Sequence, residues 1–414
     1  MTSISLESRT VDCAVLFTIL VAALGYFVDI FDLLLFAIVR VQSLKDLGVA
    51  PEALLSTGIN LLNAQMAGLL IGGFLWGVIG DRMGRVKVLF GSILLYSVAN
   101  IANGFVQSVD IYMALRFIAG IGLAGELGAG VTLASELLPK KWRGLGTTFI
   151  ASIGVAGAML AATLAEITDW RTAYMIGGCM GLGLLALRFK VRESGMYRKV
   201  EENEKPVRRG RVSMLFRNPV LLKRYVSVIL IGAPLWAMIG LFITFTPEFA
   251  RDMGMTDIPT AGKAVFYCYF GLVFGDAFIG LLSQKLQSRR KAVAVSLVML
   301  IIMTALYVGI PHKTLGVYYA LCFSLGISVG YWAMFVQMGA EQFGTNIRAT
   351  AATTIPNVVR AITIPVTFAF RGLTDYLGVT VSGVAVLGFT IVLAFIALYN
   401  LRETFGADLD YVEG

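Results

Sequence analysis

The sequence predicts an all-helical membrane protein with about twelve transmembrane helices in two pseudo-symmetric bundles of six. Of its 414 residues, 57% are hydrophobic and 14% are charged, with a mean hydropathy of +0.79. Soluble proteins carry about 25% charged residues, so this composition is typical of an integral membrane protein. A spanning helix needs about 20 apolar residues, and the chain has room for about twelve with short loops.

Apolar stretches separated by short polar segments define the expected helices. In chain order they are residues 13–41, 56–80, 86–107, 110–138, 144–166, 171–189, 225–249, 262–284, 290–310, 314–340, 349–371 and 379–401. We expect four parts: an N-terminal bundle over 1–189, a cytoplasmic linker over 190–224, a C-terminal bundle over 225–401 and a cytoplasmic tail over 402–414.

Short motifs recur at about half the chain length. Residues 136–143 match 341–348 at an offset of 205, and residues 192–194 match 402–404 at an offset of 210. An even number of spans in each half makes the halves parallel repeats, related by an axis along the membrane normal. The repeat therefore predicts two bundles with the same internal topology.

Basic residues are distributed unevenly between the two sides of the membrane. On the side that holds both termini and the linker there are 25 Lys and Arg residues, against 7 on the other side. Cytoplasmic loops carry the excess of Lys and Arg, so both termini are predicted to be cytoplasmic. The excess of Lys and Arg on the cytoplasmic side accounts for the net positive charge of the chain. We therefore expect no nucleic-acid partner.

The segment from Gly77 to Lys87 reads Gly-Val-Ile-Gly-Asp-Arg-Met-Gly-Arg-Val-Lys between two long apolar stretches. This pattern resembles the loop between the second and third helices of major facilitator superfamily transporters. Residues 116–126 resemble the Arg-x-x-x-Gly segment of the fourth helix in that superfamily. Residues 192–194 and 402–404 resemble its Pro-Glu-Ser and Pro-Glu-Thr motifs without the proline. The resemblance implies transport by alternating access.

Ionisable residues within the predicted spans are candidates for proton coupling, because charge in a bilayer is costly and is retained for function. Asp29 and Asp32 lie three residues apart on one face of the first helix, in a pattern that resembles the Asp-x-x-Asp of aromatic-acid and phosphate proton symporters. Counting 1.5 Å per residue brings Arg116 of the fourth helix to a similar depth. An ion pair is therefore expected, with either aspartate as the proton carrier, and Glu126 is a second candidate.

Arg360 is expected close to the membrane midplane, where transporter sites lie between the repeats. The guanidinium matches carboxylate or phosphate geometry. Asp276 falls at the same depth, so either the two neutralise each other or Arg360 meets an anionic substrate. Four further residues could line the same cavity: Trp236, Trp332, Gln337 and Asn357.

Carboxylate and arginine residues gather at the predicted cytoplasmic ends of the helices. We expect them to form ion-pair networks that close this side when the central site faces outward, with glycines at the turn allowing close helix approach. The predicted gating residues are Gly77, Asp81, Arg82, Gly84, Arg85, Glu136, Arg143, Glu341 and Arg348.

The sequence thus predicts a monomeric transporter of a bacterial inner membrane that takes up a small organic metabolite, an anion by preference, together with protons. Proton-driven export of amphipathic compounds, a sugar or metabolite facilitator, and a transporter-like receptor are the alternatives. No paired catalytic acids, Ser/Lys dyad or metal-ligand spacing appears, so no enzyme activity, metal or cofactor is expected.

Overall fold

The computed structural model describes residues 13–83, 85–126, 143–188 and 217–406. Over these residues the regular structure is helical, without strands. The N-terminal half contains α1 (Cys13–Asp46), the 3-10 turn η1 (Pro51–Ala53), α2 (Leu54–Met83), α3 (Arg85–Asn103), α4 (Val109–Leu123), α6 (Arg143–Ile167) and α7 (Trp170–Arg188).

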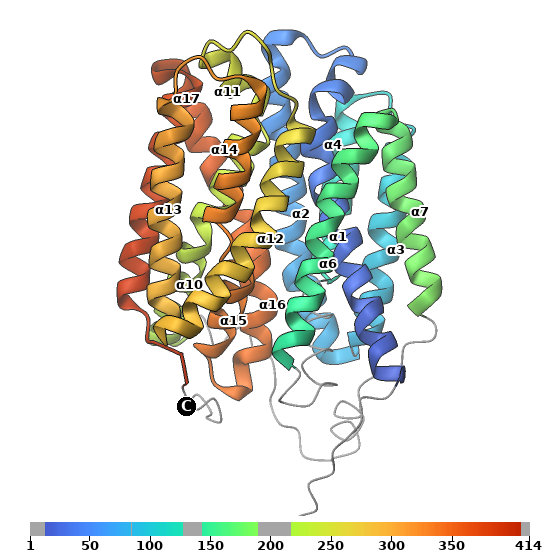
Figure 1. The fold of residues 1–414 in the computed structure, drawn as a ribbon. Helices are drawn as coiled ribbons and strands as arrows, with labels where there is room; N and C mark the ends of the chain where they lie inside the picture. Colours follow the sequence, from blue (N-terminus) through green and yellow to red (C-terminus); the bar gives the residue numbers. More distant parts are fainter. Residues whose placement is uncertain (1–12, 84, 127–142, 189–216, 407–414) are drawn as a thin grey trace, which may run out of the picture.

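The C-terminal half begins with α10 (Pro219–Met238), the π-helical turn η2 (Ile239–Ile243) and α11 (Thr246–Asp252). It continues with α12 (Ala261–Leu286), α13 (Arg289–Gly309), α14 (Leu315–Ser328), α15 (Trp332–Glu341), α16 (Thr345–Ala361) and α17 (Thr363–Asn400). Within α17 the backbone of Gly378 leaves helical geometry at φ 75°, which separates the eleventh span from the twelfth. Figure 1 shows the two halves side by side, with the C-terminal half on the left.

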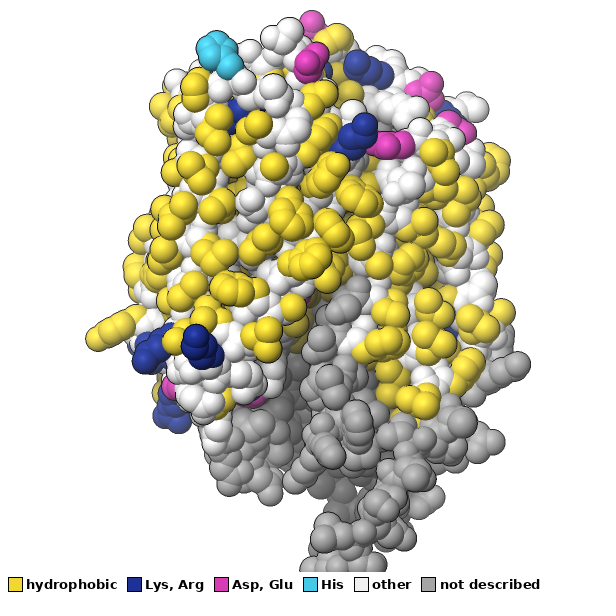
Figure 2. Space-filling view, viewed as in Figure 1, with side chains coloured by type: hydrophobic (Ala, Val, Ile, Leu, Met, Phe, Trp, Pro, Cys, Tyr) yellow, Lys and Arg dark blue, Asp and Glu magenta, His cyan; other side chains and the backbone are white. Residues whose placement is uncertain are grey.

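Seven helices in the described part of the chain are long and apolar enough to cross a membrane. In Figure 2 hydrophobic side chains cover the middle of the visible face, while coloured charged side chains gather towards its two ends. This distribution suits a protein whose middle faces lipid and whose ends face water. The predicted cytoplasmic end, where α1 begins and α17 ends, is the lower end in Figure 1.

Paired glycines repeat the same helix crossing in both halves. A Cβ added to Gly68 of α2 would lie 2.1 Å from the carbonyl oxygen of Phe117, and one added to Gly120 of α4 would lie 2.2 Å from that of Gln65. The corresponding contacts join α12 and α14 through Gly271 and Gly326, at 2.0 and 1.9 Å from carbonyl oxygens. Close packing of this kind requires small residues. The glycine positions differ by 203 and 206 residues, close to the repeat read from the sequence.

The halves meet along α12 against α6 and along α16 against α2. Within the N-terminal half α1 packs on α6, α2 on α4 and α3 on α7; within the other half α10 packs on α17 and α12 on α14. Helices α1 and α12 also touch, so that α1 borders both the interior of its own bundle and the junction between halves. This position governs the roles of its two aspartates.

Some predicted boundaries were wrong. The seventh helix starts at Pro219 rather than 225, because the Asn218 side chain accepts hydrogen bonds from the N–H groups of Val220 and Leu221 and proline suits the first turn. Part of the predicted fourth helix, residues 127–138, lies outside the described residues. Gly77 was expected at a close helix approach, but a Cβ added there meets no described atom within 4 Å.

Candidate functional site

A buried ion pair joins α1 to α4, as the sequence predicted. Arg116 Nη1 lies 3.2 Å from Asp32 Oδ1, and Nη2 donates to the Asp32 carbonyl oxygen at 3.2 Å. The same Nη1 donates to Asn100 Oδ1, and the guanidinium lies 5.3 Å from the centre of the Tyr174 ring. Both charged side chains are buried, so the pair lies inside the N-terminal half.

Asp29 has a different partner from Asp32. Its Oδ2 accepts a hydrogen bond from Arg360 Nη2 at 3.2 Å, and both residues are 0% exposed. Arg360 belongs to the last turn of α16, directly before the helix break at Ile362. This ion pair therefore crosses the junction between the halves. The two aspartates, which the sequence left equivalent, are assigned by the structure to two different arginines.

Aromatic side chains surround Arg360. The guanidinium lies 5.7 Å from the centre of the Trp236 ring, and the Trp236 and Trp332 rings are 6.0 Å apart in an edge-to-face arrangement. Trp332 Nε1 donates to the Tyr26 hydroxyl at 3.1 Å, again between halves. Trp236 thus lies beside Arg360, and Trp332 packs on Trp236; that they line a substrate cavity stays a prediction. Arg360 Nε and Nη1 and Trp236 Nε1 are buried without a hydrogen-bond partner in the described part of the chain.

Asp276 does not pair with Arg360, so the prediction that these two residues neutralise each other was wrong. Its Oδ1 accepts the backbone N–H of Ala333 at 3.1 Å, in the first turn of α15. The tenth span is broken between α14 and α15, and the free N–H groups at the start of α15 attract a carboxylate. Because of this break, Asp276 caps the start of α15, and Arg360 pairs with Asp29 instead.

Two predicted cavity residues have other partners. Gln337 Nε2 donates to Glu341 Oε1 at 2.9 Å, one helical turn further along α15, so it belongs to the predicted cytoplasmic end rather than to the surroundings of Arg360. Asn357 Nδ2 donates to the Ala124 carbonyl oxygen at 3.0 Å and so connects α16 with the N-terminal half. Asn357 has a bridging position that the sequence did not indicate.

Glu126 forms a second buried ion pair in the N-terminal half. Its carboxylate accepts from Arg188 Nη2 at 2.6 Å and Nη1 at 3.1 Å, and from Ser92 Oγ at 2.7 Å. Gly25 on α1 leaves the space, because a Cβ there would lie 2.3 Å from Arg188 Nη2. Arg188 is one of the 25 basic residues counted on the cytoplasmic side, yet it is 2% exposed.

Arg40 is one of the seven basic residues that the sequence analysis counted on the outer side, and it is fully buried between the halves. Its Nη2 lies 2.7 and 2.8 Å from the two carboxylate oxygens of Glu248, and its guanidinium lies 4.6 Å from the centre of the Phe245 ring. Thr367 Oγ1 also donates to Asn63 Oδ1 across the junction at 2.7 Å. These contacts hold the halves together at the predicted outer end.

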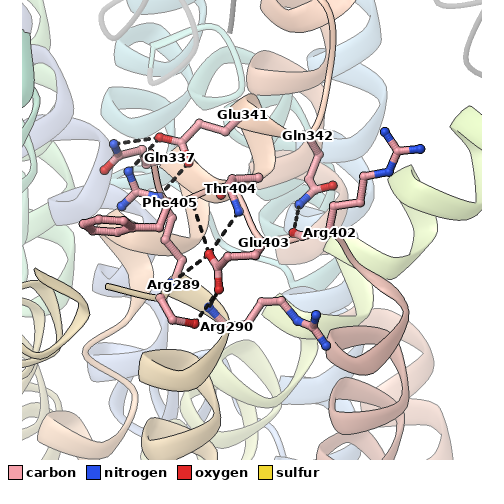
Figure 3. Close-up of polar contacts among 10 residues, drawn as sticks. Arg289, Arg290, Gln337, Glu341, Gln342, Arg402, Glu403, Thr404 and Phe405 are labelled. Atoms are coloured by element: carbon pink, nitrogen blue, oxygen red, sulfur yellow. Dashed lines mark hydrogen bonds and ion pairs between the residues drawn. The ribbon is translucent and has the colours of Figure 1, made fainter. Parts of the chain in front are cut away.

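Polar contacts at the other end gather around the start of α13 (Figure 3). Arg289 makes two hydrogen bonds to Glu341, from Nε at 2.6 Å and from Nη2 at 2.8 Å. Arg289 also lies over the Phe405 ring, 5.7 Å from its centre. Glu341 therefore pairs with an arginine of its own half that the sequence had not connected to it.

The remaining predicted gating residues cannot be placed in this network. Gly84 and Glu136 lie outside the described residues. Four others fall in or at the ends of helices whose side chains there are not described: Asp81, Arg82, Arg85 and Arg143. The same holds for Arg348 in α16. Their gating role stays a prediction.

Glu403 closes the start of α13 by accepting hydrogen bonds from the Ser288 hydroxyl and from the backbone N–H of Arg289 at 3.0 Å. Burial alone would raise the pKa of Glu403, but the bonds from Ser288 and from backbone N–H groups outweigh it and lower the pKa. A carboxylate with a lowered pKa stabilises the fold above its unfolded pKa, and this contribution is lost as pH falls through the folded pKa.

We therefore expect Glu403→Gln to unfold at a lower temperature than the wild type near neutral pH, with a difference that narrows in acid. Thermal unfolding of the purified wild type and variant in detergent, near neutral pH and at acidic pH, measures this difference in unfolding temperature. Glu52→Gln, on the exposed turn η1, is the control. If Glu403→Gln lowers the unfolding temperature equally near neutral pH and in acid, the ionised carboxylate does not have the role proposed here.

Comparisons with known proteins agree with this architecture. Residues 16–363 match the family model of the Major Facilitator Superfamily. A protein of Cupriavidus pinatubonensis named a probable 4-methylmuconolactone transporter is 27% identical over 361 residues, covering 82% of this chain and 79% of its own. The niacin transporter NiaP of Acinetobacter baylyi is 30% identical over 181 residues, which are 43% of this chain and 40% of its own.

The fold also matches a solved structure. The crystal structure of a D-xylose-proton symporter superimposes with a TM-score of 0.73 at 18% identity, covering 95% of this chain and 99% of that one. This likeness concerns the fold, which comprises twelve transmembrane helices in two bundles. The family match, with the buried ion pairs and the junction between halves, identifies the chain as a multi-pass membrane transporter of the Major Facilitator Superfamily, and not an enzyme.

Proposed function

We propose that this transporter takes up a small monocyclic carboxylate together with protons. The observation that carries the proposal is Arg360: its guanidinium is 0% exposed, lies between the two halves, and has Nε and Nη1 without a partner in the described part of the chain. Buried donors of this kind call for an acceptor. An anionic substrate supplies one at the place where substrates bind in parallel-repeat transporters.

The neighbours of Arg360 favour a flat, unsaturated ring attached to the anion. Trp236, Trp332 and Tyr26 provide aromatic faces and edges, which pack on rings edge-to-face or offset. A guanidinium accepts a carboxylate through two parallel hydrogen bonds. Niacin, named for one relative, is a pyridine carboxylate, and 4-methylmuconolactone, named for another, is also a small ring compound. These two names support a small ring compound with an acid group as the substrate class.

Asp29 supplies a physical link between proton and substrate. The ionised carboxylate of Asp29 and the carboxylate of a substrate are two anions that compete for one guanidinium. A proton on Asp29 neutralises that competitor and leaves Arg360 to the substrate, since arginine itself stays charged. Uptake of one proton with one monovalent anion is electrically neutral, so the pH gradient drives it.

The wider arrangement follows from the charge bias and the repeat. We place both termini on the cytoplasmic side of a bacterial inner membrane, with residues 1–189 and 219–401 as the two moving bundles, 190–218 as their linker and 402–414 as a tail. The protein works as a monomer because the substrate residues come from two halves of one chain. The predicted gating residues from Gly77 to Arg348 close the cytoplasmic side in alternation with the outer contacts at Arg40.

Purified protein in proteoliposomes tests the proposal. With the outside more acidic than the inside, we expect nicotinate and benzoate to accumulate, and a protonophore to abolish the accumulation. D-Xylose serves as a neutral control and is expected not to enter. Accumulation of D-xylose instead, or carboxylate movement that follows its own gradient regardless of the pH gradient, would contradict proton-coupled uptake of an acid.

A further inference from the structure

A buried line of polar side chains runs along α3 through the interior of the N-terminal half. Its members are all 0% exposed, and we call them the α3 polar stripe: Ser92, Tyr96, Ser97, Asn100 and Asn103. Residues three and four apart share one face of a helix. Helix α3 packs against α4 and α7, so this face looks into the bundle and away from lipid.

The stripe reaches both buried carboxylate–arginine pairs of this half. Asn100 Oδ1 accepts from Arg116 Nη1 at 3.2 Å, the same nitrogen that holds Asp32. Ser92 Oγ donates to Glu126 Oε1 at 2.7 Å. The two contact points are eight residues apart on α3, or about 12 Å along its axis. Tyr96 lies between them.

Several polar atoms along this line have no hydrogen-bond partner among the residues that the structure describes. They are the Tyr96 hydroxyl, Ser97 Oγ and both amide atoms of Asn103. Leaving one such group unsatisfied costs about 1–3 kcal/mol. Folded proteins satisfy buried polar groups with protein or with ordered water, and internal waters occupy polar sites that offer two to four partners. The clustering of these atoms points to a chain of internal water.

We propose that water held by the α3 polar stripe is a proton route between Asp32 and Glu126, entered from the predicted outer end near Asn103. It lies within one bundle and is separate from the substrate site at Arg360, although it rests on the proposed proton coupling. A proton passes from one water or hydroxyl oxygen to the next, each oxygen giving one proton as it accepts another. A proton accepted by Asp32 is thus matched by one delivered to Glu126.

Charged and titratable groups from the neighbouring helices face both ends of the route. Around Asp32 these are Arg116 and Tyr112 of α4 and Tyr174 of α7, whose hydroxyl lies 2.7 Å from that of Tyr112. Around Glu126 the facing charge is Arg188 of α7. Asp29 lies one helical turn after Gly25, which contacts the Glu126–Arg188 pair. The route therefore passes close to the aspartate that competes for Arg360.

Radiolytic labelling tests the water directly and needs no substrate. Hydroxyl radicals generated from bound water modify side chains beside it, even when they are closed to bulk solvent. Tyr96 is expected to be modified, whereas Tyr307 is not, because it is equally buried but its hydroxyl is paired with that of Tyr318. Equal, low modification of both tyrosines would overturn the proposal.

Transport by Tyr96→Phe tests the proton step. With nicotinate as the probe in proteoliposomes, we expect uptake driven by the pH gradient to slow about tenfold or more, since a positioned proton donor is lost. Nicotinate exchange at equal pH is expected to stay unchanged, and Tyr307→Phe to leave both rates unchanged. Unaltered driven uptake, or an equal loss of exchange, would overturn the route. If the wild type transports no nicotinate, the proposed substrate class is wrong. The radiolytic labelling of Tyr96 still shows in that case whether internal water lies beside the α3 polar stripe.

Discussion

Arg360→Ala is expected to weaken nicotinate binding by at least about 30-fold. Truncating one partner of a buried, hydrogen-bonded charge pair costs about 2–5 kcal/mol, and 1.4 kcal/mol is a factor of ten in Kd. Arg360 is 0% exposed, so water cannot replace the guanidinium once it is removed. Isothermal titration calorimetry of the purified protein with nicotinate measures the loss.

Two further variants identify the cause of this loss. Arg360→Lys keeps the charge but not the planar fork, so binding weaker than wild type and stronger than Arg360→Ala is expected. Removing Arg360 also leaves Asp29 as a buried, unpaired charge. The double variant Arg360→Ala with Asp29→Asn removes both charges, and it should regain thermal stability without regaining affinity. Nicotinate affinity equal to wild type in Arg360→Ala would remove Arg360 from the substrate site.

Depth within the membrane could be predicted from the sequence, because it depends only on counting residues along helices. Counting placed Arg116 at the height of Asp29 and Asp32, and the Asp32–Arg116 pair is present at 3.2 Å. It also predicted Arg360 near the midplane, and Arg360 is found between the two halves, paired with Asp29. Neither result needed knowledge of how the helices pack.

The neighbouring helix that a side chain faces around its own helix axis could not be predicted in the same way. Asp29 and Asp32 are about 60° apart around α1, which is one face by any sequence criterion. Because α1 borders both its own bundle and the junction, this small difference in angle is enough for Asp32 to pair with Arg116 and for Asp29 to pair with Arg360. Only the packing of α4 and α16 around α1 separates the two.

Buried arginines near helix ends were missed for a related reason. Arg40 and Arg188 each follow a long apolar run, and a charge at that point normally belongs to a loop. Both are fully or almost fully buried, because Glu248 and Glu126 come from other helices to meet them. The flanking sequence held one signal: Val39 and Val41 enclose Arg40 with apolar residues on both sides.

Asp29→Asn is expected to abolish accumulation of nicotinate against its gradient while leaving exchange intact. In the wild type, nicotinate and the ionised Asp29 compete for Arg360, so affinity should rise as the pH falls, by at most about tenfold per pH unit for one coupled proton. An asparagine carries no charge and takes no proton. The variant should therefore bind nicotinate with an affinity that is nearly independent of pH.

Asp32→Asn separates the two aspartates in the same assays. Asp32 faces Arg116 inside the N-terminal half and does not contact Arg360, so the pH dependence of binding should persist in this variant. Accumulation should nevertheless fail, because an asparagine at this position takes up no proton and so interrupts the proposed proton route. If Asp29→Asn retains pH-dependent affinity, the proton that governs substrate binding is carried elsewhere. If accumulation is unchanged in both variants, neither aspartate couples transport to protons.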